Sequence, residues 1–217
     1  MGSEMCIRDS LNPILASLAL GIALVVDAIS DPLIGAWSDR FRSKWGRRHP
    51  FIYSSILPLC VSFYLLFTEP NSYSQTYLFS KLLILVLIIR ISLTFYEIPR
   101  ASLGPELTKD YDKRNFVNGW AYVAAVVAGT TVTFVMYSYF LTETEEFTGN
   151  KAFLNPDGYK YFGLLSGLLI VIFGLISAVS THRFIPYLHK AESQAGFSIN
   201  NFLKELFECF SNRSWLV

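Results

Sequence analysis

The sequence predicts an all-α polytopic membrane protein, and three observations support this fold class. Of the 217 residues, 52% are hydrophobic and 16% are charged, and the mean hydropathy is +0.38, which is too apolar for a typical soluble domain. Five apolar runs are long enough to cross a bilayer, which takes roughly 20 helical residues. Lysine and arginine gather in alternate loops between these runs. Helices are expected because a membrane leaves only helices or closed barrels to satisfy backbone polar groups.

The totals also exclude several function classes. The formal net charge is +1, so nothing indicates a nucleic-acid partner. The cysteines show neither metal nor disulfide spacing, and the histidines form no pattern with a nucleophile or a metal. These residues are Cys6, Cys60, Cys209, His49, His182 and His189. We therefore expect no enzyme activity and no cofactor.

The chain divides into three parts. Residues 1–10, MGSEMCIRDS, share no pattern with the rest, and we interpret them as an unrelated or artefactual tail. Residues 11–183 should hold five transmembrane helices, at about 13–37, 50–68, 76–103, 116–140 and 160–182. Residues 184–217 read as a cytoplasmic central loop with an amphipathic helix. Its apolar positions repeat at helical spacing: Ile199, Phe202, Leu203, Leu206, Phe207 and Phe210.

Prolines and small residues add local expectations. Pro99 and Pro105 should interrupt the third span, because proline removes a backbone donor. Small residues at every fourth position favour close helix packing in lipid. They occur in the fourth and fifth spans: Ala121, Ala125, Gly129, Thr133, Gly163 and Gly167.

Charge asymmetry predicts the orientation of the spans. The loop after the first span holds five basic residues, and the loop after the third holds three, whereas the loop at 69–75 has none. The loop at 141–159 has only Lys151, against four acids. Because basic loops stay on the inner side, we expect a plasma (inner) membrane protein with residue 12 outside and its C-terminal segment cytoplasmic.

Two carboxylates, Asp27 and Asp31, lie inside the first apolar run, four residues apart and so on one helix face. An ionised group inside a membrane costs at least roughly 2.5 kcal/mol and is usually functional. Because the two acids repel each other, one proton or one cation between them lowers the energy. The Ser30 hydroxyl offers a further oxygen ligand. We expect a cation site; the alternative is that each acid only pairs with a neighbouring helix.

The third span also carries charge, at Arg90, Glu97 and Arg100. A rise of about 1.5 Å per residue places Asp27 and Arg90 at similar depths, and Asp31 level with Glu97. We therefore expect two charged layers. One joins Asp27 to Arg90, and the other joins Asp31 to Glu97 and Arg100. Two alternatives stay open: Glu97 and Arg100 pair with each other, or Arg90 reaches a cavity or an acid on a span outside this sequence.

The loop after the first span contains two motifs, Gly35-x-x-x-Asp39-Arg40 and Gly46-Arg47-Arg48. They resemble the loop between spans two and three of the major facilitator superfamily. Further segments narrow the resemblance to the glycoside–pentoside–hexuronide:cation symporters, a melibiose-permease-like family. These segments are DAISDP at 27–32, RSKWGR at 42–47, YEIP at 96–99 and LGPELT at 103–108. The resemblance covers residues 11 to about 215.

The resemblance implies a partial N-terminal helical bundle, about spans two to six of a longer transporter. It implies Na⁺- or H⁺-coupled symport of a sugar or glycoside by alternating access around a site near the midplane. The implied partners are that solute, the lipid bilayer and the rest of the transporter. Two other classes stay open: a transporter of lipid or another organic solute with the same fold, and a non-transporting membrane protein.

The resemblance also assigns roles residue by residue. Cation binding falls to Asp27, Ser30, Asp31 and Thr94, and the metal site it allows is Na⁺ at Asp27 and Asp31. Solute binding falls to Glu97, Arg100 and Arg90. Conformational gating falls to Gly35, Asp39, Arg40, Gly46, Arg47 and Arg48. The chain departs from the family at Arg90, where a small residue is expected.

Overall fold

The computed structural model describes residues 11–68, 74–107, 110–144, 149, 152 and 155–185. Its elements are α2 (Pro13–Arg40), α3 (His49–Leu66), α4 (Gln75–Leu107), α5 (Tyr111–Val135), the π-helical turn η1 (Met136–Phe140) and α6 (Pro156–His182). Among the described residues, five helical stretches are long and apolar enough to cross a membrane. The all-α fold class is confirmed. The tail at 1–10 and the amphipathic helix predicted at 199–210 lie outside the described residues.

Short polar signals start three of the helices. The Asn12 side chain accepts a hydrogen bond from the backbone N–H of Ile14 at 2.9 Å, and the Asn155 side chain does the same for Asp157 at 3.1 Å. A proline follows each asparagine and occupies the first turn, where its missing N–H costs nothing. Asp110 caps α5 in the same way, by accepting from two backbone N–H groups.

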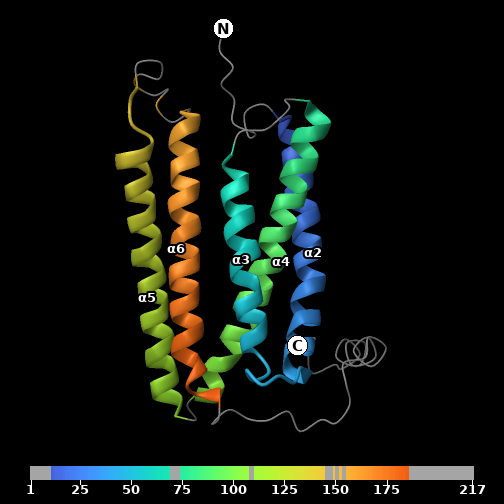
Figure 1. Ribbon diagram of the computed structural model, residues 1–217, viewed down its shortest axis with the longest axis vertical. Coiled ribbons are helices and arrows are strands. Elements are labelled where there is room, and N and C mark those ends of the chain that lie inside the picture. Colours follow the sequence, from blue (N-terminus) through green and yellow to red (C-terminus); the bar gives the residue numbers. More distant parts are fainter. Residues whose placement is uncertain are drawn as a thin grey trace, which may run out of the picture.

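The helices pack in a row in which α2 lies on α4, α4 on α3, and α3 on α6 (Figure 1). Two small apolar clusters hold the row together. Leu11 packs with Leu78 at the start of α2 and α4. Ile52, Leu103 and Ala178 meet at the opposite end, and so join α3, α4 and α6. The helix α5, the fourth along the described chain, is linked to α6 through η1.

Successive helices run in opposite directions, so α2 and α4 are parallel to each other (Figure 1). The end of α2, the start of α3, the end of α4, the start of α5 and the end of α6 therefore gather at one end of the bundle. Both predicted basic loops belong to this end. The arrangement agrees with the alternation of basic and non-basic loops in the sequence.

The small residues of α6 pack closely, as predicted, but those of α5 do not. A Cβ atom added at Gly163 would lie 2.8 Å from Phe67 Cβ, and one at Gly167 would lie 3.2 Å from Cys60 Sγ, so both glycines let α6 approach α3 and its C-terminal turn. By contrast, every member of the α5 stripe is exposed, and a Cβ at Gly129 would meet no atom within 4 Å. No described helix lies against that face, so the close packing of α5 stays a prediction.

The expectation that Pro99 and Pro105 interrupt the third span is wrong. The helix α4 continues through both to Leu107. Pro99 is among the fully buried side chains, so the helix packs closely around it although proline donates no backbone hydrogen bond. Pro32 and Pro58 also lie inside helices, in α2 and α3, and both are exposed.

The glycine contacts predict a stability difference. In the complete membrane protein, Gly163→Ala should lower the unfolding free energy by about 1–3 kcal/mol, because the added methyl overpacks a rigid contact with Phe67. Gly129→Ala is the matched control and should change stability much less. Thermal unfolding in detergent measures both. Equal melting temperatures for Gly163→Ala and the unmodified protein would contradict the close α3–α6 contact.

Candidate functional site

Two polar contacts join α2 to α4 near the middle of both helices. Arg90 Nη1 donates to Asp27 Oδ2 at 3.1 Å, and Thr94 Oγ1 donates to Asp31 Oδ1 at 2.8 Å. Both pairs are separated by 63 positions in the sequence. On each helix the two residues are four positions apart, so the two contacts lie one helical turn apart along the helix pair. The predicted contact between Asp27 and Arg90 is confirmed.

The Asp27–Arg90 ion pair is only partly shielded from its surroundings. The Asp27 side chain is 19% exposed and the Arg90 side chain is 41% exposed. The second carboxylate oxygen of Asp27, Oδ1, is buried and has no hydrogen-bond partner in the described part of the chain. Removing Arg90 would therefore leave a largely buried carboxylate without its counterion, which is the costly way to break such a pair.

The Thr94 hydroxyl lies between two acceptors. Besides the Asp31 carboxylate, the backbone carbonyl of Arg90 is 3.1 Å from Thr94 Oγ1. A threonine hydroxyl has one hydrogen and two acceptor lone pairs, so it can donate to one of these oxygens and accept from another group at the same time. Ser30 is arranged differently, because its hydroxyl donates to the backbone carbonyl of Asp27 at 3.4 Å.

The second predicted charged layer is not present. Asp31 contacts Thr94, whereas Glu97 and Arg100 are exposed and make no hydrogen bond or ion pair with any described residue. The depth estimate gave the height of these residues but not their partners. Two carboxylates such as Asp31 and Glu97 repel each other, and Asp31 Oδ1 instead accepts a hydrogen bond from the Thr94 hydroxyl.

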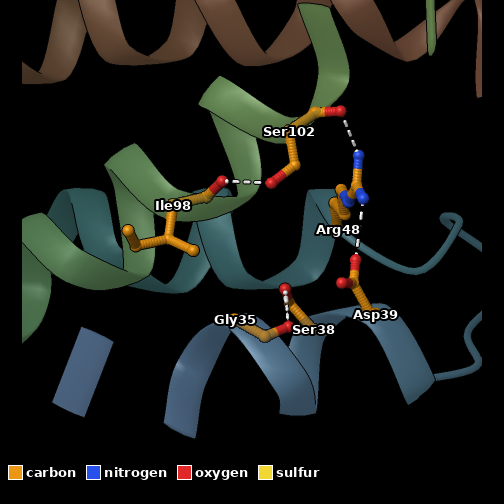
Figure 2. A network of polar contacts seen from close by, with 6 residues as sticks. All are labelled: Gly35, Ser38, Asp39, Arg48, Ile98 and Ser102. Atoms are coloured by element: carbon orange, nitrogen blue, oxygen red, sulfur yellow. Dashed lines mark hydrogen bonds and ion pairs between the residues drawn. The ribbon is translucent and has the colours of Figure 1, made fainter. Parts of the chain in front are cut away.

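A second polar network joins α2, α3 and α4 at the end of the bundle where the basic loops belong. Figure 2 shows Arg48, the residue before α3, between Asp39 of α2 and Ser102 of α4. Arg48 Nη2 lies 2.7 Å from Asp39 Oδ1, and Arg48 Nη1 donates to the Ser102 carbonyl. The Arg48 side chain is 7% exposed and the Asp39 side chain 53%. One buried guanidinium therefore connects three helices.

The two predicted gating glycines differ in their surroundings. A Cβ at Gly35 would lie 3.5 Å from Ile98 Cγ2, an ordinary contact distance, so α2 and α4 leave room for a small side chain beside the network (Figure 2). Gly46 has a φ of 80°, a left-handed conformation that glycine adopts without strain. Arg40 and Arg47 are half-buried and flank the same loop. Of the gating residues, the structure brings Asp39 and Arg48 into direct contact.

Sequence reasoning missed a set of contacts between α3 and α6. His49 Nε2 lies 3.1 Å from Thr181 Oγ1, and the Tyr53 hydroxyl lies 3.3 Å from His182 Nδ1. His49 is fully buried. The spacing of His49 and Tyr53 places both on one face of α3, which was visible in the sequence. Their partners on α6 were not, because no local pattern connects residues about 130 positions apart.

Comparisons with known proteins find a matching family and several relatives. The chain matches the family of MFS/sugar transport proteins over residues 10–217. It is 31% identical to an uncharacterized symporter of Synechocystis over 57% of the chain, and 30% identical to the inner membrane symporter YicJ of Escherichia coli over 53%. It is 25% identical to the lactose permease of Lactobacillus delbrueckii over 88%. The matches cover 23%, 25% and 30% of these relatives' own lengths.

The ion pair predicts a non-additive pair of substitutions. In the complete protein, Arg90→Ala should reduce the unfolding free energy by a few kcal/mol, somewhat below the roughly 3–5 kcal/mol of a fully buried pair, because Arg90 is 41% exposed. Adding Asp27→Asn should restore part of the loss, since the stranded charge is gone. Thermal unfolding of both variants tests this. If the double variant is no more stable than Arg90→Ala and the two defects simply add, the two residues do not act as a pair.

Proposed function

This chain belongs to the MFS/sugar transport protein family, and from that membership we propose that it forms part of a secondary active transporter. The transporter takes up a sugar or glycoside together with Na⁺ or H⁺ by alternating access. In this mechanism two halves rock around a site near the middle of the membrane. The relatives named as symporters and as a lactose permease support a small-molecule solute.

The observation that carries the proposal is the pair of polar contacts between α2 and α4. Carboxylates in the middle of an apolar helix are costly and are usually retained for ion or solute pathways. Asp27 has a counterion in Arg90, whereas the described partner of Asp31 is a neutral hydroxyl. Asp31 is therefore the acid best placed to take up and release a monovalent cation, with Thr94 as its neighbour in the site.

The proposed solute contacts lie on α4. Glu97 and Arg100 are exposed and make no polar contact with a described residue. Within a membrane span, such side chains face a water-filled cavity, a polar ligand or a charged partner on another span. A carboxylate accepts hydrogen bonds from hydroxyl groups and a guanidinium donates them, which matches the surface of a sugar.

The proposed gate is the network of Asp39, Arg48 and Ser102. It lies at the end of the bundle with the basic loops, which the positive-inside rule assigns to the cytoplasm, with residue 12 outside. Placement in the plasma (inner) membrane is supported by the inner membrane symporter among the relatives. Because Arg48 is buried while Asp39 is half-exposed, the contact can open only if the guanidinium gains water or another partner as the helices move.

The coupling role of Asp31 is tested by Asp31→Cys in proteoliposomes of the complete transporter, with the sugar that a substrate screen identifies. Accumulation against a gradient should be lost, because the cation site loses its carboxylate, while exchange of solute across the membrane persists. The matched control is Asp112→Asn, an exposed acid at the start of α5. Full accumulation by Asp31→Cys would overturn the assignment.

The gating role predicts a different kinetic signature for Asp39→Ala. Turnover should fall about fivefold, the equivalent of an ion pair worth about 1 kcal/mol, because the contact with Arg48 helps to form one of the alternating states. Solute affinity should stay close to that of the unmodified protein. Initial rates at several solute concentrations separate the two effects. A large loss of affinity with unchanged turnover would place Asp39 in the solute site instead.

A further inference from the structure

We propose that His49 is a pH-sensitive clamp between α3 and α6, which holds the end of α6 beside the gate residue Arg48 and opens when the side of the basic loops becomes acidic. Opening the clamp slows transport, because the gate then loses its fixed position against α6. The inference rests on the proposed gate and on its cytoplasmic placement. Three observations carry it: the burial of His49, its unpartnered ring nitrogen, and its position next to Arg48.

His49 lies where the gate and the end of α6 meet. It follows Arg48 directly, and Arg48 joins α2 to α4 through Asp39 and the Ser102 carbonyl. His49 Nε2 lies 3.1 Å from Thr181 Oγ1, near the end of α6. Two consecutive residues therefore connect the start of α3 to α2, α4 and α6. A movement of His49 is passed to Arg48 through a single peptide unit.

The hydrogen bonds around Thr181 assign the proton on the His49 ring. Besides His49, the Thr181 hydroxyl lies 3.0 Å from the Ser177 carbonyl and 3.1 Å from the Ala178 carbonyl. A threonine hydroxyl has one hydrogen. The most hydrogen bonds form when this hydrogen points to a carbonyl of α6 and the Nε2–H of His49 donates to Thr181 Oγ1. His49 Nδ1 then carries a lone pair, and it is buried without a hydrogen-bond partner in the described part of the chain.

A second proton on His49 is unfavourable while the clamp is closed. It would form an N–H bond at Nδ1, where no described residue accepts a hydrogen bond. His49 is 0% exposed, so the imidazolium would lose its hydration. Its charge would also lie beside the buried and permanently charged Arg48. Protonation of His49 therefore requires an open clamp, in which the ring reaches water.

A second histidine, His182 on α6, acts in the same direction. The centroids of the His49 and His182 rings are 5.5 Å apart, and the Tyr53 hydroxyl lies 3.3 Å from His182 Nδ1. In the neutral ring, Nδ1 can accept the tyrosine hydrogen, whereas protonation replaces that lone pair with an N–H. Acidification would place like charges on α3 and α6, and their repulsion separates the two helices.

The groups around His49 do not offset these charges. The helices packed against α3 are α4 and α6, and α2 reaches the same end through Asp39. Asp39 is paired with Arg48, and Glu97 is exposed without an ion pair to any described residue. The other described charged or titratable groups near this end, on α4, α6 and the loop before α3, are Arg42, Lys44, Arg47, Tyr96, Arg100, His182 and Arg183. Apart from the tyrosine they are basic, so they favour opening on acidification.

Distances between nitroxide labels in the purified complete transporter test the clamp without any solute. The labels are attached through Ser54→Cys on α3 and Val179→Cys on α6, two exposed positions, after the native cysteines have been replaced. A histidine released to water titrates near pH ~6.5, so the ratio of long to short distances should rise about tenfold between pH ~7.5 and pH ~5.5. His49→Gln keeps a donor for Thr181 but takes up no proton in this range, so the rise should be lost.

A second variant keeps the test decisive if His49→Gln does not fold. Thr181→Val removes the acceptor of the His49 hydrogen bond, so the clamp should open at a pH higher by about half to one unit, the effect of one hydrogen bond. Thr131→Val is the matched control, because the Thr131 hydroxyl also donates to a carbonyl of its own helix but is exposed on α5. The control should leave the pH of opening unchanged.

Solute exchange with the same pH on both sides then links the clamp to the gate. On acidification, the unmodified transporter should lose several-fold more of its exchange rate than His49→Gln does. Distances that do not respond to pH, or that respond equally in His49→Gln, would overturn the clamp. Equal losses of exchange in the two proteins would overturn its link to the gate. No exchange by the unmodified protein at neutral pH would overturn the proposed transport function instead, and the distance measurement would still decide the clamp.

Discussion

The contact between Asp27 and Arg90 is the constraint on which the rest of the structure depends. A carboxylate and a guanidinium in the middle of apolar helices are costly apart, so their pairing sets how α2 and α4 lie against each other. Once this register is set, parallel helices place Asp31 opposite Thr94 one turn further along. The same register brings Gly35 against Ile98 and places the end of α2 near the end of α4. A candidate ion site and a candidate gate therefore share one helix pair.

The candidate ion site and the candidate gate are close enough along α2 for a movement at one to reach the other. Asp27 and Asp39 lie on the same helix, about 18 Å apart along its axis at 1.5 Å per residue. Arg48 then connects Asp39 to α3 and α4, and its neighbour His49 contacts α6 through Thr181. A change in the charge of the α2–α4 cluster can thus reach the packing of four helices through rigid elements. In this account, the helix α2 itself links the ion site to the gate formed by Asp39, Arg48 and Ser102, and no flexible segment lies between them.

Much of this arrangement was predictable from the sequence, because bilayer thickness limits span length and buried charge demands a partner. These two constraints predicted the five spans and the Asp27–Arg90 contact. The family resemblance had placed Thr94 in one cation site with Asp31, and the two are in contact. The depth estimate, which paired Asp31 with Glu97, could not make that choice, since it depends on side-chain reach and on repulsion between two acids at equal depth. The exposed face of α5 and the histidine contacts with α6 were missed for a related reason. Both depend on which helices become neighbours, and local spacing does not contain that information.

The most direct test of the central claim is an experimental structure of the complete transporter in a lipid nanodisc, determined in buffer containing Na⁺. The account predicts that a guanidinium nitrogen of Arg90 lies about 3 Å from the Asp27 carboxylate. It also predicts that Asp31 faces the Thr94 hydroxyl one turn away. A structure in which Arg90 turns to an acid on another helix, with Na⁺ bound between Asp27 and Asp31, would contradict it.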